Sequence, residues 1–367
     1  LPAGMPVYTC AMGPASDQSL LDQIATVSGG RYYYMPTIDD LFEIYNYIRG
    51  QITGDSIVAN ASATASSSRI GAFVDALATE ATFNVAWADE RLRYVSGEPR
   101  RADEVSVRLR SPRGELLHPD CSYMRRIIGR GYVAFKFDEP EPGQWYVEVS
   151  TAGDTHVRYT LGAFVKSPLR LHASVRPNHF IIGTTFNIAT KVFDGKVPVT
   201  GSRATAHVVA PTTGIAGLLK KFKTQLRDIP PLKAPGGDVF PGDIGKLLAL
   251  RTKLLTSTKR DILAHITRPV TLRSATADDL NRLCFTDWIP DLVRPAVAAT
   301  ADGPMLPIRN AAGWALPGLL LGGAAVLAGA FRDTAEAGSY NVAVTVNGSA
   351  RGGTRFVRKD LVSVVIR

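Results

Sequence analysis

Apolar side chains at every second position constrain the fold of this chain more than any other feature. Five such segments follow one another between residues 81 and 165: Ala81–Trp87, Glu104–Leu109, Tyr132–Phe137, Trp145–Val149 and Val157–Val165. A period of two places the apolar side chains on one face, as in a half-buried strand. Turn sequences rich in Pro, Gly and Asp separate the segments. This pattern predicts an antiparallel β-sandwich over residues 55–166.

The first fifty residues follow a different pattern, in which strand-like and helix-like segments alternate. Val7–Met12 and Arg31–Met35 are short apolar runs of the kind that form buried strands. After each run, apolar residues recur at helical spacing, over Gln18–Val27 and Ile38–Ile52. Residues suited to cap or end these helices flank them: Ser16 or Asp17, Gly29-Gly30, and Thr37. The order predicts an α/β unit over residues 1–54.

This α/β unit resembles the last two strand–helix units of a von Willebrand factor type A domain. The residues that carry the resemblance stand in the family's order: Val7-Tyr8-Thr9, Gly13, Asp17, Leu20-Leu21, Ile24-Ala25, Gly29-Gly30, Tyr32-Tyr33, Leu41, Ile44-Tyr45 and Ile48. In that family a metal ion lies on an Asp-x-Ser-x-Ser loop after the first strand, and none of its ligand positions matches a residue here. We therefore expect no cofactor, and a divalent cation only if a parent protein carries that loop upstream.

Three motifs within residues 55–166 extend the resemblance. Phe83–Trp87, Leu109–Gly114 and Pro142–Trp145 are similar to the β-sheet module that follows the type A domain in calcium-activated chloride channel regulators and related bacterial surface proteins. The resemblance implies a multidomain bacterial protein, extracellular or in the cell envelope, that works in binding or adhesion to a protein or surface ligand. The unpaired sheet edge of the α/β unit would also allow oligomers to form.

A second immunoglobulin-like sandwich is predicted from two separate parts of the chain, residues 167–211 and 332–367. The first part contains strand patterns at Leu171–Val175, Thr185–Val192 and Ala204–Ala210. In the second part Tyr340 precedes alternating valines, and we expect its ring to pack at a strand corner with its hydroxyl bonded. A turn is predicted at Asn347-Gly348. The fold class is thus mainly β, with two immunoglobulin-like sandwiches.

Residues 212–331 separate the two parts and are too long an insertion for an unstructured loop. Helical spacing over Thr213–Asp228 and Asp243–Leu255 predicts a mostly helical insertion that presents an interaction surface. Its last segment, Ala311–Phe331, has no charged residue in twenty-one positions, so its length permits membrane association. Pro317 and five glycines in this segment favour a hairpin or packed loop instead.

The basic charge of the chain is concentrated in one region. The formal net charge is +9, and residues 211–310 supply +6 of it, with 15 Lys and Arg against 9 Asp and Glu. We expect no nucleic-acid partner, because no recognisable nucleic-acid module or set of stacking aromatic residues accompanies the charge. The three cysteines, Cys10, Cys121 and Cys284, are odd in number and lack C-x-x-C spacing, which argues against both a disulfide framework and a zinc ribbon.

Two groups of residues are candidates for chemistry, although the G-x-S-x-G and H-E-x-x-H signatures do not occur. Gly54-Asp55-Ser56 resembles the nucleophile block of GDS-type esterases, in which Ser56 would act with Asp261 and His265. A Gly-Asp turn is the simpler interpretation. Candidate metal ligands lie in two turn sequences: His118 and Asp120, then Asp138, Glu139 and Glu141.

The sequence thus leads to two alternative functions. The first is a binding or adhesion protein in which the sandwiches are spacers and the insertion is the interaction surface. The second is a hydrolase, esterase-like or part of a metal-dependent protease assembly. Its site would lie between the insertion and the sandwich, or in a part that precedes residue 1.

Overall fold

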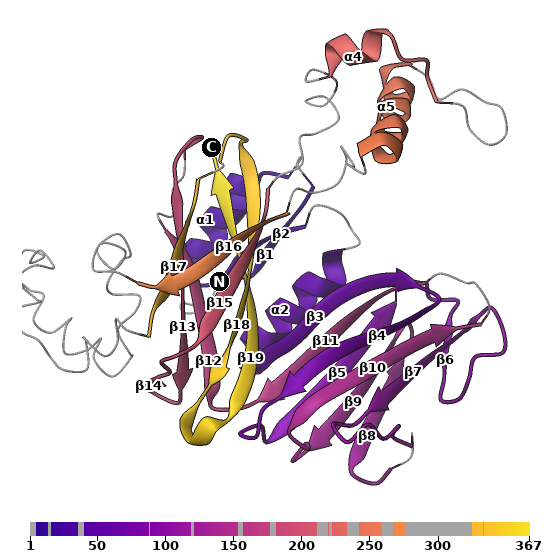
Figure 1. The fold of residues 1–367 in the computed structure, drawn as a ribbon, viewed down its shortest axis with the longest axis vertical. Coiled ribbons are helices and arrows are strands. Elements are labelled where there is room, and N and C mark those ends of the chain that lie inside the picture. The colour runs from indigo at the N-terminus through magenta and orange to yellow at the C-terminus, as the bar shows by residue number, and fades with distance from the viewer. Residues whose placement is uncertain are drawn as a thin grey trace, which may run out of the picture.

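The chain folds mainly into β-strands, which form large antiparallel sheets (Figure 1). The computed structural model describes residues 5–13, 16–35, 40–87, 89–118, 121–152, 157–176, 181–210, 219, 222–232, 242–258, 267–275, 325–332 and 334–367. These residues form a two-stranded sheet, a four-stranded sheet and a 13-stranded sheet.

The N-terminal α/β unit has the predicted order of elements. β1 (Thr9–Met12) and β2 (Tyr32–Met35) pair in parallel, with α1 (Gln18–Ser28) between them and α2 (Leu41–Thr53) after them. Asp17 caps α1, because its side chain accepts a hydrogen bond from the Leu20 N–H at 3.0 Å. Gly29 ends the helix with a φ of 74°, a conformation that glycine adopts at little cost. The other predicted cap, Thr37, lies outside the described residues.

The next part of the chain forms two facing layers of strands. The strands are β3 (Ser56–Ala65), β4 (Ser67–Val74), β5 (Glu80–Trp87), β6 (Arg93–Val95), β7 (Glu104–Arg110), β8 (Met124–Gly129), β9 (Tyr132–Asp138), β10 (Gly143–Thr151) and β11 (Val157–Lys166). One layer has the order β4-β10-β7-β6, and the other has the order β3-β11-β5-β9-β8. A core lies between them, where the ring of Trp145 is 5.4 Å from that of Phe83 and 4.9 Å from that of Phe137. The predicted period-two alternation is confirmed in β5, β7 and β9.

The C-terminal part continues the second of these layers. Its strands are β12 (Leu169–Arg176), β13 (Phe186–Asp194), β14 (Val197–Pro198), β15 (Arg203–Val209), β16 (Thr267–Ser274), β17 (Leu327–Phe331), β18 (Gly338–Ser349) and β19 (Arg355–Ile366). They follow the order β12-β13-β17-β16-β15-β18-β19, with β14 on β13, and enclose a second core. β19 also pairs with β3 at Lys359 and Ile57, so the sheet runs through both parts. As predicted, Tyr340 is buried, and its hydroxyl donates to the Glu336 carbonyl at 2.9 Å.

The turn predicted at Asn347-Gly348 is wrong. Both residues pair within the β18–β19 ladder, and the chain reverses at Arg351–Gly353. Gly352 and Gly353 have φ values of 72° and 75°, which suit a tight turn. Gly348 is needed for a different reason, because a Cβ there would lie 2.9 Å from Ser202 Oγ.

The insertion contributes strands as well as the predicted helices. α4 (Lys223–Arg227) and α5 (Gly242–Thr258) pack against each other through Leu226, Leu247 and Leu250, and Figure 1 shows them standing away from the sheets. β16 and β17, which the sequence analysis does not predict, join the large sheet between β15 and β13. β17 occupies the end of the apolar segment Ala311–Phe331, of which residues 311–324 lie outside the described residues. No helix in the described part of the chain has both the length and the apolar character of a membrane span.

The α/β unit is attached to the large sheet through buried polar contacts. Tyr34 of β2 donates its backbone N–H to Ser363 Oγ at 3.2 Å, and its carbonyl accepts from Asn341 Nδ2 at 2.8 Å. The Arg31 guanidinium contacts both carboxylate oxygens of Asp360, at 2.9 and 3.0 Å. The side chains of β18 and β19 therefore satisfy backbone groups of β2 that no third strand pairs with among the described residues.

Candidate ligand-binding groove

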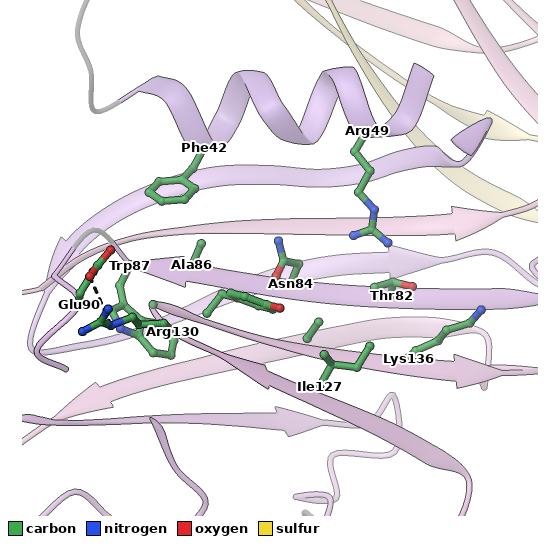
Figure 2. A pocket seen from close by; sticks show the side chains of 13 residues that line it. Phe42, Arg49, Thr82, Asn84, Ala86, Trp87, Glu90, Ile127, Arg130 and Lys136 are labelled. Carbon is green, nitrogen blue, oxygen red and sulfur yellow. Dashed lines mark ion pairs between the residues drawn. The ribbon is translucent and has the colours of Figure 1, made fainter. Parts of the chain in front are cut away.

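A groove of about 500 Å³ lies between α2 and the outer face of strands β5, β9 and β8. We call it the α2 groove. Figure 2 shows Phe42 and Arg49 of α2 pointing toward the strand residues on the opposite side. The groove is lined by Phe42, Arg49, Thr82, Asn84, Ala86, Trp87, Glu90, Ile127, Arg130, Gly131, Tyr132, Ala134 and Lys136.

The period-two pattern of the strands places polar side chains on the groove face. In β5 the core takes Phe83 and Val85, so Thr82 and Asn84 point to the other face. β9 follows the same rule, with Phe135 in the core and Lys136 in the groove. The polar side chains of the groove are therefore not part of the sandwich core, whereas Trp87 contributes to both.

Helix α2 forms a fixed wall of the groove because it packs closely on β3 and β11. Asn46 of α2 donates to Asn60 Oδ1 of β3 at 2.9 Å, and Asn60 donates to the Glu43 carbonyl at 2.9 Å. Gly162 of β11 permits this approach, since a Cβ there would lie 2.6 Å from the Asn46 side chain. The helix covers β3 and β11 and leaves the outer face of β5, β9 and β8 open.

Cations outnumber anions in the groove. Its lining contains Arg49, Arg130 and Lys136 but only one carboxylate, that of Glu90, which lies 3.4 Å from Arg130. Arg49 stacks over the Phe164 ring at 4.4 Å, and its partial burial lowers the pKa of the guanidinium from its ordinary value, although Asp55 opposes this shift. The groove is therefore suited to a ligand that carries negative charge and an apolar group.

The strand pair β8–β9 brings one further cation, Arg125, beside Lys136 at the rim. Arg125 of β8 is directly opposite Lys136 of β9 in the register. Like charges in this position destabilise a strand pair. Lys136 is partly compensated by Glu80, 2.6 Å away, which also contacts Lys166 at 3.3 Å. Hydrogen bonds from these lysines hold the pKa of Glu80 below its ordinary value, so it stays ionised.

The structure places Ser56 in a buried position. Its hydroxyl donates to the Leu169 carbonyl at 2.8 Å and so connects β3 with the start of β12. Gly54 ends α2 with a φ of 69°, as expected for the Gly-Asp turn. The proposed partners Asp261 and His265 lie outside the described residues, so a catalytic role for them stays a prediction.

The candidate metal ligands do not gather into a cluster in the described part of the chain. His118 is exposed in the segment before β8, and Asp120 lies outside the described residues. Asp138 and Glu139 are exposed at the end of β9, where Glu139 has a φ of 52°. Glu141 binds Arg113 at 2.7 Å instead.

The residues of the α2 groove were not predicted from the sequence. The alternation of β5 and β9 contains part of the signal, because it assigns Thr82, Asn84 and Lys136 to the face opposite the core. The missing information was tertiary: no local pattern indicates that α2 packs beside this face, or that β8 is the last strand of its sheet.

Comparisons with known proteins give no family assignment. No family model matches the chain, and no curated protein matches it. Three solved structures show low similarity. A DUF4785 family protein from Legionella pneumophila has a TM-score of 0.37 and 9% identity over 85% of this chain, and the Bacillus licheniformis lipase BlEst2 in its propeptide form has a TM-score of 0.34 and 9% identity over 84%. A mutant of Salmonella alpha-2-macroglobulin has a TM-score of 0.21 and 10% identity over 82%. The chain spans 63%, 41% and 15% of the lengths of these proteins, respectively.

Proposed function

We propose that this chain is a ligand-binding module and that the α2 groove is its binding surface. The observation that carries the proposal is the composition of the groove. It combines exposed apolar side chains, such as Tyr132 and Ile127, with an excess of cations on a face that the core does not use. Concave surfaces with apolar walls and a few convergent polar groups are typical of binding sites.

The wider biological role follows the resemblance of the sequence. We propose adhesion or binding in an extracellular or envelope-associated bacterial protein, with residues 1–54 as the C-terminal part of a von Willebrand A-like domain and the two β-rich parts as immunoglobulin-like sandwiches. The parallel β1–β2 pair with its two helices and the two β-rich cores support this proposal. The buried hydrogen bond of Ser56 gives no support to the hydrolase alternative.

A peptide-display selection against the purified chain tests the proposed binding surface. Ala134 lies on the groove face beside Ile127, so an Ala134→Trp variant fills the groove from its floor. We expect selected ligands to bind this variant at least tenfold more weakly. Thr205→Trp, at an exposed position of β15, is the matched control and should bind normally. Ligands that bind all three proteins equally would place the binding surface elsewhere.

A further inference from the structure

The outer edge of β8 is open in the part of the chain that the structure describes. β8 pairs with β9 on one side and is the last strand of its sheet. An edge strand presents backbone N–H and C=O groups that can pair with another extended segment. We call this feature the β8 edge; it consists of the outer backbone edge of Met124–Gly129.

The side chains of β8 carry a specific pattern of charge and apolar surface. Its sequence contains two arginines followed by two isoleucines, Arg125-Arg126-Ile127-Ile128. Successive residues of a strand point to opposite faces, so each face of β8 has one cation and one apolar side chain. Ile127 and Ile128 are 46% and 54% exposed, which is unusual for neighbouring isoleucines in a strand.

We propose that the β8 edge binds an extended acidic peptide segment of a partner protein, which adds to the sheet as a further strand beside the α2 groove. The proposal rests on the proposed binding function and names the class of partner. Backbone hydrogen bonds would supply affinity, and the side chains of β8 would select the sequence.

Charge determines which segment fits. Arg125 already opposes Lys136 across the β8–β9 pair, so a carboxylate beside Arg125 relieves a repulsion present in the free protein. An antiparallel second copy of β8 would place Ile128 and Ile127 opposite Arg125 and Arg126, and would supply no carboxylate. The arginines therefore favour an acidic partner over self-pairing.

The order of residues in β8 specifies the order in the partner. In an antiparallel strand, two apolar residues lie opposite Ile128 and Ile127, and two acidic residues follow opposite Arg126 and Arg125. The preferred segment is thus Val-Val-Glu-Glu, read from its N-terminus. The permuted segment Val-Glu-Val-Glu has the same composition, but it places both carboxylates on one face and both valines on the other.

Fluorescence anisotropy with two labelled peptides, Thr-Val-Val-Glu-Glu-Thr and Thr-Val-Glu-Val-Glu-Thr, tests this selection. We expect the first to bind the intact chain at least tenfold more tightly than the second. In an added strand, alternate N–H groups of the peptide face β8 and the others face solvent. N-methylation of the N–H groups that face β8 should abolish binding of the first peptide, whereas methylation of the other set should preserve it. Equal binding of the two sequences, or equal effects of the two methylation sets, would overturn the proposal.

A charge exchange tests the contact with Arg125. The Arg125→Glu variant should bind Thr-Val-Val-Glu-Glu-Thr at least tenfold more weakly, whereas Arg203→Glu, at an exposed site on β15, should not. Replacing the second Glu of the peptide by Lys should restore binding to Arg125→Glu. Absence of this rescue would contradict strand addition in the proposed register.

The two proposals fail differently. If the acidic peptides do not bind but selected ligands are sensitive to Ala134→Trp, the α2 groove is a binding surface and the β8-edge proposal is wrong. If selected ligands are insensitive to Ala134→Trp, the proposed function is wrong whatever the peptides do.

Discussion

At the scale of single residues, the most consequential group is a buried ion pair between the two β-rich parts. The side chains of Arg358 and Asp75 are both 0% exposed and lie 2.7 Å apart. The Arg358 guanidinium also donates to the Ser167 hydroxyl at 2.9 Å and to the Leu169 carbonyl at 3.0 Å. These bonds connect β19 with the segment that joins β11 to β12. Because both charged side chains are removed from water, each needs the opposite charge of the other to offset the cost of its burial.

Removing one partner of this pair should be costly. Asp75→Ala leaves the Arg358 charge buried without its carboxylate, and we expect the free energy of unfolding to fall by about 3–5 kcal/mol. Urea denaturation measures the change. The double variant Asp75→Ala/Arg358→Met, which removes both charges, should recover much of the loss. A double variant as unstable as the single one would show that the loss of stability does not come from leaving one charge unpaired.

Lys191 should make stability depend on pH. It is 3% exposed, and desolvation lowers its pKa from 10.5 to about 8. Between about pH 8 and 10.5 the unfolded chain binds more protons than the folded chain, so Lys191 makes the free energy of unfolding rise with pH. Below about pH 8 Lys191 is protonated in both states, and its destabilising effect is then independent of pH. We expect Lys191→Met to be more stable than the native chain by about 1–3 kcal/mol at pH 7.

The difference between these two proteins should shrink as pH approaches 9.5, because the native Lys191 then loses its proton in the folded state. Urea denaturation of both proteins from pH 7 to 9.5 provides the comparison. Other groups that titrate in this range affect both proteins and cancel in the difference. A difference that is constant over this range would show that Lys191 is not desolvated.

At the scale of elements, the contact of α2 with the sheet depends on small and polar residues. Gly162 lies beneath Asn46, and Asn46 and Asn60 are 6% and 9% exposed. A substitution that displaces Asn46 would leave buried amide groups without partners. The position of α2, and with it the width of the α2 groove, is therefore sensitive to a change on β11.

Gly162→Ala should destabilise the chain by about 1–3 kcal/mol, because the new methyl group pushes the Asn46 amide away from Asn60. Thermal denaturation monitored by circular dichroism measures the effect. Gly97→Ala is a matched control, since a Cβ at Gly97 meets no atom within 4 Å. Equal melting temperatures for Gly162→Ala and the native chain would show that α2 is not held in this way.

Sequence patterns predicted elements well where local and tertiary preferences agree. The alternation of Phe83 and Val85, and the cap at Asp17, correspond to the structure because burial and capping depend on nearby residues. Strand β16 was not predicted, and Pro269 within it weakens its strand pattern. Pro269 is tolerated because β16 pairs there only with β15, and β17 pairs further along at Arg273 and Ser274.

The candidate site was less predictable than the elements. Ser56 was singled out by its neighbours in the sequence, but its environment depends on Leu169, which is far away in the chain. The α2 groove combines residues from α2, β5, β8 and β9, and only their packing brings them together. Arg125 and Lys136 are informative only once the β8–β9 register is known.

At the scale of the whole molecule, the α/β unit, the facing layers and the C-terminal strands are connected through one sheet and its buried polar contacts. This arrangement keeps α2 beside the open face of β5 and β9, with the β8 edge at its rim. In the proposed function, this region is the binding surface of the module.

Hydrogen–deuterium exchange of the intact chain, with and without the peptide Thr-Val-Val-Glu-Glu-Thr, tests this claim most directly. Strand addition should slow the exchange of backbone amides in residues 125–129 that face away from β9, because they become donors to the peptide. The edge strands β4 and β12 should exchange at unchanged rates. Saturating peptide that leaves β8 unprotected, or protects β4 or β12 instead, would contradict the account.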